Sequence, residues 1–201
     1  MRFFFNIAVA LAALAGRTKA QTNRAILDVG AQRGTANQLA SGVLYGTPDT
    51  ENQIPDRFYT EAKIKYFRAG GAQLFNVGER GWHIGEYPGR FRSTLSNYRT
   101  ARKYGGEFQL LPHDIWGTDT VVAGTPWPGD NGDWSDYHRF LDTLFADIKA
   151  NNMIPGLKWD VWNEPNLDIF WKRPLSQWLQ LWKITHDRLR YVLIQKHHII
   201  F

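Results

Sequence analysis

The sequence predicts an α/β fold of the (β/α)8 TIM-barrel type, of which this chain holds about the first four βα units. Short apolar runs alternate four times with longer segments of helical periodicity, a pattern typical of βα units joined into a parallel sheet. Neither a dinucleotide-binding glycine fingerprint nor a Walker loop occurs, which disfavours an open, doubly wound sheet. Polar residues mixed with Trp follow each predicted strand, as at the active face of a barrel.

The amino-terminal residues have the features of a secretory signal peptide. Arg2 precedes an apolar run that is too short to span a membrane, and a small residue, Ala20, follows at the expected cleavage position. We therefore predict a signal peptide over residues 1–20, secretion to the extracellular space, and a polar leader over residues 21–40. Residues 41–201 then form the barrel segment. The alternative for the apolar run is a buried amino-terminal helix.

Composition excludes several classes of partner. Removing residues 1–20, which contain Arg2, Arg17 and Lys19 but no acidic residue, lowers the formal net charge of +5 by three. The remaining basic residues are scattered, so we expect no nucleic-acid partner, and no membrane association once the signal is cleaved. The chain of 201 residues has no Cys, so its stability is expected to depend on core packing. No oligomeric state is predicted.

The first βα unit is predicted over residues 41–71. Residues 41–45 read as a buried strand that ends at a Gly-Thr-Pro loop. Residues 55–69 carry aromatic and Ala residues at helical spacing, and Gly70-Gly71 follow, so a helix with a glycine C-terminal cap is predicted. The second strand is then expected over residues 72–77.

The second and third units are predicted from residue 95 onward. A helix over residues 95–104 precedes a third strand over residues 107–111. The loop over residues 112–133 is rich in Gly, Pro, Asp and Trp, and its length favours a functional loop. Asp133 is expected to cap the next helix, which has apolar residues at helical spacing as far as Ile148.

The last predicted unit contains the segment KWDVWNEPN, residues 158–166. A fourth strand is expected over residues 156–162, and a helix beginning at Pro174 carries Trp178 and Trp182 on one packed side. Strand alternation through this segment would put Glu164 on the same side as Asp160, and Pro165 would end the strand. Glu164 is therefore expected to be held at the rim of the barrel by a rigid strand.

Aromatic neighbours give Glu164 a possible chemical role. Partial desolvation by Trp side chains would favour the protonated carboxyl, which could then act as a general acid near neutral pH. An acid in an ordinary surface ion pair is the alternative for Glu164, and a turn-forming Asn is the alternative for Asn163. For Asp160 we expect a structural pairing with an Arg or a His.

Residues after the four predicted strands suit a sugar ligand. Sugars offer apolar C–H faces that stack on aromatic rings and hydroxyl groups that need fixed donors and acceptors. The relevant segments contain Thr47 to Asp49, Glu79 to His83, His113 to Trp116, and Asn163 to Asn166. Trp127 and Trp134 are further aromatic candidates, although Trp134 is expected in the core because it opens a helix.

Three segments of this chain resemble the clan A glycoside hydrolases, closest to family 39-like secreted fungal glycosidases. They are WDVWNEPN, LLPHDIWG and GDNGDW, and the resemblance extends over residues 41–190, the amino-terminal part of such enzymes. It implies that Glu164 is the catalytic acid/base and that Asn163 binds the 2-hydroxyl of the sugar. It also implies substrate contacts for five other residues, His113, Trp116, Glu79, Arg80 and Trp82. Neither a cofactor nor a metal is expected.

The resemblance implies a retaining glycoside hydrolase acting on O-glycosidic bonds of plant or fungal polysaccharides or oligosaccharides, with xylosides and related pentosides as its suggested substrates. A retaining enzyme needs a second carboxylate about 5 Å from the first, and the clan supplies it from the seventh strand. We therefore expect this chain to be a fragment, inactive by itself. The alternative is a non-catalytic carbohydrate-binding protein with a degenerate barrel.

Overall fold

The computed structural model describes residues 26, 28, 30, 31, 34, 35, 39–45, 47–71, 81, 82, 85–112 and 126–194. The chain divides into two units, Met1–Asn37 and Gln38–Phe201. All helices and strands named below belong to the second unit. Within these described ranges, every helix is too short or too polar to cross a bilayer.

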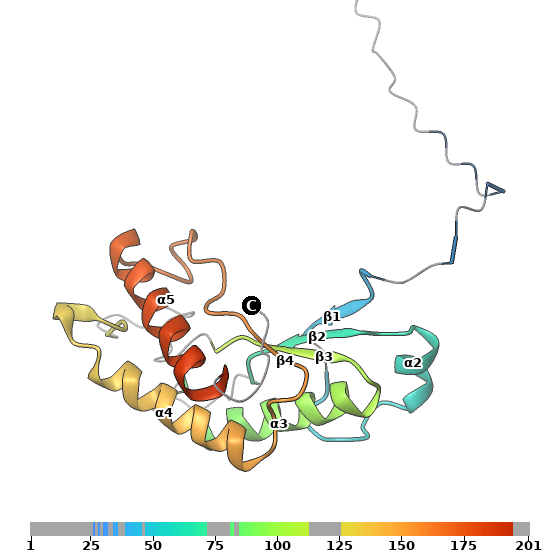
Figure 1. The fold of residues 1–201 in the computed structure, drawn as a ribbon, viewed down its shortest axis with the longest axis horizontal. Coiled ribbons are helices and arrows are strands. Elements are labelled where there is room, and N and C mark those ends of the chain that lie inside the picture. The colour runs from blue at the N-terminus through green and yellow to red at the C-terminus, as the bar shows by residue number, and fades with distance from the viewer. Residues whose placement is uncertain are drawn as a thin grey trace, which may run out of the picture. The chain divides into compact units, whose positions relative to one another are not determined.

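Four short parallel strands form one sheet (Figure 1). They are β1 (Gly42–Leu44), β2 (Tyr66–Ala69), β3 (Glu107–Leu110) and β4 (Leu157–Trp159). Their order in space is their order in the chain, so each crossover advances the sheet by one strand in the same direction. The predicted α/β class and the parallel sheet are therefore confirmed. These four strands show no reversal of order of the kind that defines a doubly wound sheet.

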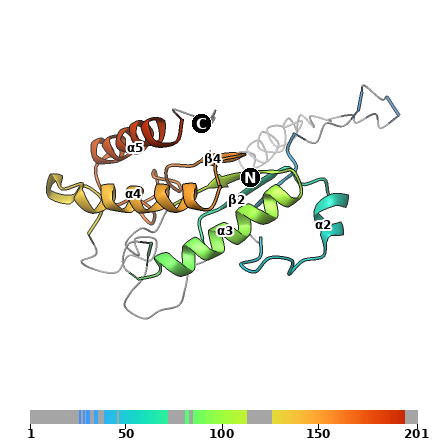
Figure 2. The same ribbon diagram turned by 60° about the horizontal axis from the view of Figure 1, so that its bottom comes forward.

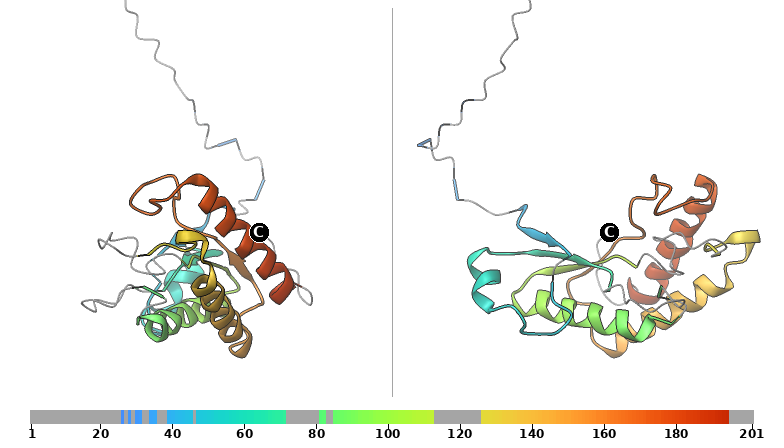
Figure 3. Two further views of the ribbon diagram at one scale, coloured as in Figure 1. Left: turned by 90° about the vertical axis from the view of Figure 1, so that its left-hand side faces the viewer. Right: turned by 180° about the vertical axis from the view of Figure 1, so that it is seen from behind.

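The helices lie between consecutive strands or after the last one. They are α2 (Asp56–Glu61), α3 (Tyr87–Lys103), α4 (Ser135–Ala150) and α5 (Leu175–Leu189), with the short turns η2 (Asp130–Gly132) and η3 (Arg190–Ile194). In Figure 2, α3, α4 and α5 follow one another from the bottom to the top of the view. The end-on view in the left panel of Figure 3 shows the same succession around the strands. α3 packs on β2 and β3.

The two faces of the sheet differ sharply in character. One face is apolar and covered by helices, and it contributes Phe67, Ala69, Phe108, Leu110, Leu157 and Trp159 to the core. The opposite face, which we call the open face, carries Leu44, Tyr66, Arg68, Glu107, Gln109 and Lys158, all exposed or half-buried. Because side chains alternate along a strand, each strand contributes to both faces. The hydrophobic core therefore lies between the sheet and the helices.

The prediction for residues 55–69 is wrong in its second half. α2 ends at Glu61, Lys63 adopts a left-handed φ of 50°, and the chain then enters β2. Tyr66 is 41% exposed and Phe67 only 1%, which is the period of two that a strand requires. Two adjacent aromatic residues fit the helical period and the strand period equally well. Here the segment forms a strand because it pairs with β1 and β3. The strand predicted over residues 72–77 lies outside the described residues.

The other elements agree with the predictions to different degrees. β3, α4 and α5 lie where strands and helices are predicted, whereas α3 begins at Tyr87, well before the predicted start at residue 95. Pro88 stands in the first turn of α3, where a helix needs no N–H donor, so this proline does not break the helix. β1 is confirmed in position, but Leu44 is 66% exposed, so the strand is not buried as predicted.

Candidate active site

The carboxyl ends of three neighbouring strands bring a polar cluster together on the open face. Arg68 of β2 donates from Nε to Oδ2 of Asp160 at 2.9 Å, and Gln109 Nε2 of β3 donates to the same oxygen at 3.0 Å. The Arg68 and Asp160 side chains are 21% and 25% exposed. Asp160 directly follows β4, and its pairing with an Arg is confirmed. The ion pair is thus mostly buried, but part of each side chain remains accessible to solvent.

The same arginine fixes Asn163. Arg68 Nη2 donates to Oδ1 of Asn163 at 3.2 Å, so one guanidinium holds both a carboxylate and an amide from the segment after β4. With its oxygen engaged, the amide of Asn163 keeps its Nδ2 donor without a hydrogen-bond partner among the described residues. This Nδ2 group is therefore available to donate to a ligand oxygen.

Glu164 adopts a left-handed backbone conformation, with φ of 38°. For a residue other than glycine this conformation costs about 1–2 kcal/mol, and such outliers gather at functional sites. The Glu164 carbonyl accepts a hydrogen bond from Leu167 N at 2.9 Å, which fixes the turn that follows. Its side chain is exposed, and within the described part of the chain its carboxylate makes no ion pair or hydrogen bond.

The position of Glu164 corrects the prediction that a rigid strand holds this residue at the barrel rim. β4 ends at Trp159, so Glu164 belongs to a turn beyond the sheet and not to a strand rim. Pro165 cannot continue a ladder, but it does not explain the left-handed turn, because a residue before proline favours an extended backbone with negative φ. What holds the segment in place is the anchor at Asp160 and Asn163.

Three buried tryptophans, one of them in this segment, pack against one another. Trp162 stands edge-on to Trp171 at 5.3 Å between ring centroids, and Trp171 stands edge-on to Trp127 at 5.2 Å. Trp162 Nε1 donates to the carbonyl of Phe170 at 2.8 Å. All three rings are at most 7% exposed, so they act as packing for the turn. The expectation that Trp127 forms a sugar platform does not fit this burial.

An ion pair ties the loop before α4 to the segment before α5. Asp130 accepts from Arg173 Nε at 2.6 Å and from Nη2 at 2.7 Å, and Gln177 adds a donor at 3.1 Å. The Arg173 guanidinium also lies over the Trp127 ring, 5.6 Å from its centroid. The Arg173 hydrogen bonds lower the pKa of Asp130 from 3.8 to about 2. The Asp130–Arg173 ion pair, which we call the clamp, therefore contacts the tryptophans beside the candidate site through the Trp127 ring.

This clamp makes stability depend on pH. Because the folded pKa of Asp130 is depressed, the stabilisation is complete above about pH 4 and is lost as the pH falls through about 2. We expect Asp130→Asn to lower the free energy of unfolding by about 1–2 kcal/mol at neutral pH, after allowing for partial solvent exposure. Urea unfolding across this pH range should show that the difference in the free energy of unfolding between Asp130→Asn and the unsubstituted protein shrinks as the pH falls. The exposed Asp168→Asn is the control, and an equal pH dependence in both variants would contradict the assignment.

The structure separates the predicted site residues into three groups. Glu164 and Asn163 lie together after β4, as predicted. Trp82 is fully buried, edge-on to Tyr87 and Phe140 at 5.7 and 6.0 Å, so it is a core residue and not the predicted sugar contact. The remaining candidates lie outside the described residues, namely His113, Trp116, Glu79 and Arg80. Trp134 is in the core, as predicted.

Sequence reasoning missed Arg68 and Gln109. Both lie on strands whose alternating pattern is short, and the β2 segment fits a predicted helix, so the sequence predicts no side chain of β2 on the open face. The alternation of Tyr66, Phe67, Arg68 and Ala69 contains the signal, since residues with polar groups at every second position mark the uncovered face of a strand.

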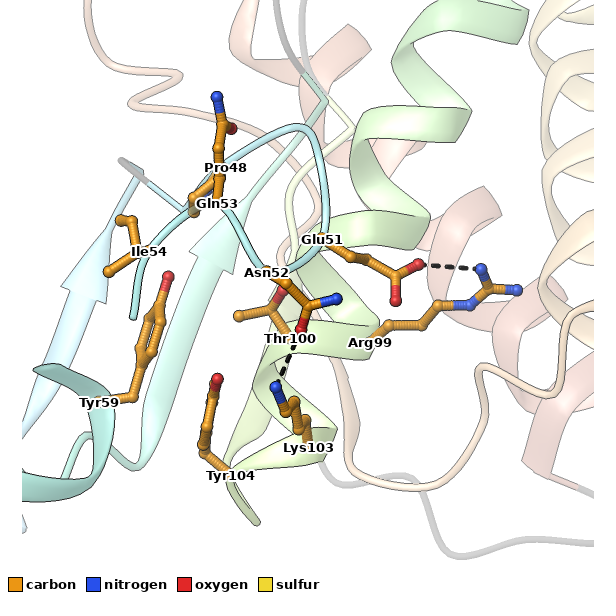
Figure 4. Close-up of a pocket in the computed structure, with 10 residues that line it drawn as sticks. All are labelled: Pro48, Glu51, Asn52, Gln53, Ile54, Tyr59, Arg99, Thr100, Lys103 and Tyr104. Carbon is orange, nitrogen blue, oxygen red and sulfur yellow. Dashed lines mark hydrogen bonds and ion pairs between the residues drawn. The ribbon is translucent and has the colours of Figure 1, made fainter. Parts of the chain in front are cut away.

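A separate cavity of about 220 Å³ lies between α3 and the loop after β1 (Figure 4). Its charged groups are already paired across it: Arg99 Nη1 donates to Glu51 at 3.0 Å, and Lys103 Nζ donates to Asn52 at 2.9 Å. The cavity is on the helix-covered side of the sheet, away from the Arg68 cluster. We therefore assign it to the packing of that loop and not to the candidate site.

Within the described ranges, no group of three or more His, Asp or Glu side chains is arranged to hold a metal ion. Comparisons of the whole chain with models of protein families, with curated proteins and with solved structures found no match. The site is therefore interpreted from its own geometry and from the motifs described above.

Proposed function

We propose that this chain carries the acid/base half of a retaining glycoside hydrolase with a (β/α)8 barrel, acting on O-glycosidic bonds of plant or fungal polysaccharides or oligosaccharides. In this proposal Glu164 gives a proton to the glycosidic oxygen as the bond breaks. It later takes a proton from the water that releases the sugar. Asn163 donates a hydrogen bond to the 2-hydroxyl, a contact that tightens as the oxocarbenium-like state forms.

The observation that carries the proposal is a fixed amide beside a free carboxylate at the carboxyl end of a parallel strand. Arg68 holds the Asn163 oxygen at 3.2 Å, and Glu164 follows in a strained left-handed turn with its carboxylate uncommitted. The carboxyl ends of parallel strands are where barrel enzymes place their catalytic groups. An amide donor and a carboxyl group are two of the groups that glycoside cleavage requires.

The sheet supports the barrel part of the proposal. Four parallel strands in sequential order, with an apolar helix side and a polar open face, match one half of a barrel wall. In a closed barrel the open face becomes the interior and Asp160 lies near its mouth. The (β/α)8 closure itself is proposed, because four strands are compatible with other repeated βα arrangements.

A retaining mechanism also needs a nucleophilic carboxylate about 5 Å from the acid/base. Asp160 does not suit this role, since its carboxylate is bound by Arg68 and Gln109. We assign the nucleophile to no described residue, and we expect the 201-residue chain alone to lack turnover. Measurable hydrolysis by this chain, abolished by Glu164→Gln, would contradict that expectation.

The decisive experiment compares leaving groups in the longest protein that the transcript encodes. A general acid matters most when the departing alcohol is a poor leaving group and least when it is an acidic phenol. We expect Glu164→Gln to lower kcat/KM for alkyl xylosides by a factor on the order of 10²–10⁴, and to lower the rate of bond cleavage in nitrophenyl xylosides far less. Glu51→Gln, which changes an exposed acid beside α3, is the control. An equal loss on both substrates would argue against the acid role.

One observation favours the second candidate, a non-catalytic carbohydrate-binding protein. Glu164 is exposed, so the described residues do not desolvate its carboxyl group as a general acid requires. In that case calorimetry should detect xylo-oligosaccharide binding that Asn163→Ala weakens, and no form of the protein should turn substrate over. Turnover that depends on Glu164 rejects this candidate.

A further inference from the structure

A second cavity, of about 520 Å³, lies at the amino-terminal ends of β2 and β3. Tyr66 and Glu107, the first residues of these strands, line it together with residues of α2 and of the turn that follows this helix. Its volume falls within the range of about 300–1,000 Å³ that is typical of small-molecule sites. The Arg68 cluster lies at the opposite, carboxyl ends of the strands, so this cavity is separate from the candidate active site.

Tyrosine rings form much of the apolar lining of this cavity. Tyr59 and Tyr104, which also line the cavity in Figure 4, stack with their ring centroids 4.6 Å apart and their planes 13° apart. Tyr104 Oη donates to Asp56 Oδ1 at 2.6 Å, and this bond fixes the stacked pair. The Tyr66 side chain is 41% exposed, so its ring remains accessible. These aromatic groups suit a ligand that has a flat, apolar face.

The charged groups of the cavity leave an excess of positive charge. Lys63 and Lys65 contribute two ammonium groups, and Glu107 contributes the one carboxylate among the described lining residues. Lys158, which is not part of the lining, has its Nζ 3.5 Å from Glu107 Oε1 and offsets that carboxylate. Among the described residues, the Lys63 side chain has no hydrogen-bond or ion-pair partner. The cavity therefore favours an anionic ligand over a cationic one.

Backbone hydrogen bonds fix the positions of both lysines. Lys65 N donates to Ser41 O at 2.9 Å, and Lys65 O accepts from Glu107 N at 2.7 Å. Lys63 follows α2 with a left-handed φ of 50°, and its N–H donates to Thr60 O at 3.2 Å. Glycine or asparagine adopts this conformation with less strain, so a lysine at this position has a conformational cost. Strained positions of this kind gather at functional sites.

The backbone N–H groups around the lysines are engaged within the fold. Besides the N–H groups of the two lysines, Ile64 N donates to Tyr59 O at 3.1 Å and Gly105 N donates to Arg102 O at 3.1 Å. Phosphate sites are commonly built from several free backbone N–H groups that point at the ligand. With these N–H groups engaged, the lysine ammonium groups remain as the cationic donors, and they suit a single carboxylate better than a phosphate.

We propose that this cavity binds a small carboxylate with one flat, apolar face, the carboxylate lying at Lys63 and Lys65 and the flat face on the tyrosine rings. An aromatic acid and a uronic acid of a glycan share this chemistry, because an aromatic ring and the C–H face of a sugar both pack on tyrosine. The proposal does not depend on the chemistry of Glu164, since it concerns the other end of the sheet.

Calorimetric titration of the full 201-residue chain tests the proposal with two acids and their neutral counterparts: 4-hydroxybenzoate and its methyl ester, and glucuronate and glucose. We expect at least one acid to bind with a Kd of about 1 mM or lower, and its neutral counterpart to bind at least about tenfold more weakly. The acid that binds identifies the source of the ligand. Added salt should weaken this binding, because both lysines are exposed.

Lys63→Gln should raise the Kd about three- to tenfold, because it removes one exposed charge. Lys149→Gln, which changes an exposed lysine of α4, is the matched control and should leave the Kd unchanged. Tyr66→Thr removes the accessible ring but keeps a strand-forming residue, so it should also weaken binding and covers the case in which Lys63→Gln does not fold.

Three results would overturn the proposal. The first is that neither acid binds at about 10 mM. The second is that the neutral counterpart or inorganic phosphate binds as tightly as the acid, because the site would then not recognise a carboxylate on a flat body. The third is an affinity that Lys63→Gln and Tyr66→Thr both leave unchanged, which would place the acid outside this cavity.

Discussion

Glu86→Ala is expected to lower the free energy of unfolding by about 3–5 kcal/mol, because it breaks an ion pair that is fully buried. Glu86 Oε2 accepts from Arg90 Nε at 2.8 Å, lies 2.7 Å from Arg90 Nη2, and accepts from Gly81 N at 2.8 Å. Both side chains are 0% exposed. The alanine removes the carboxylate that offsets the desolvated guanidinium and leaves the Gly81 N–H without its acceptor.

Urea unfolding followed by tryptophan fluorescence gives the measurement, and the chain offers a matched control. Glu51 pairs with Arg99 at 3.0 Å on the surface, with side chains 44% and 53% exposed. Exposed pairs contribute about 0–1 kcal/mol, so Glu51→Ala should shift the midpoint little. If both variants lose the same stability, then burial does not set the strength of the Glu86 pair.

The buried pair also fixes the entry to α3. Glu86 precedes α3, and its bond to Gly81 fixes the segment that enters the helix after β2. That segment includes Trp82, whose ring fills the core beside Tyr87. Glu86 thus connects the first turn of α3 to Gly81. A change at Glu86 should therefore disturb both stability and the packing of Trp82 at the entry to α3.

The sequence predicts long, strongly periodic elements well and short ones poorly. α4 carries six buried apolar side chains at helical spacing, so local pattern and tertiary packing agree. β2 has four residues, and Tyr66 and Phe67 fit a helical stripe that continues from Tyr59 as well as they fit a strand. Only the pairing with β1 and β3 distinguishes the two, and that pairing depends on residues far away in the chain.

In the candidate site, some residues have a local sequence signal and others are brought together only by the fold. Asn163 and Glu164 are predictable because their signal is local: a polar pair between an apolar run and a proline. Arg68 is about ninety-five residues away from Asn163 in the chain, and only the sheet order brings the two together. The prediction for Trp82 is wrong because an aromatic side chain after a strand suits a sugar platform and a core equally, and only its burial distinguishes the two.

Arg68→Met is the second substitution with a large expected effect, about 2–3 kcal/mol in the free energy of unfolding. Methionine retains the apolar stem but removes charge-assisted hydrogen bonds to Asp160 and Asn163. The Asp160 carboxylate then keeps only Gln109 as a donor at 3.0 Å. The expected cost is below that of a fully buried pair because both partners are about one quarter exposed or less.

A double-mutant cycle with Asp160→Leu tests whether the loss comes from the unpaired carboxylate. Removing both charges should cost less than the sum of the single substitutions, by about 1–2 kcal/mol, since no buried charge is then left alone. Additive losses would mean that Arg68 and Asp160 stabilise the fold separately. The side-chain amide of Asn163 provides an independent readout, because in both variants that lack Arg68 it loses its only described anchor and should exchange faster with solvent. Arg68 would then be the residue that positions Asn163, and Asp160 the residue that positions Arg68.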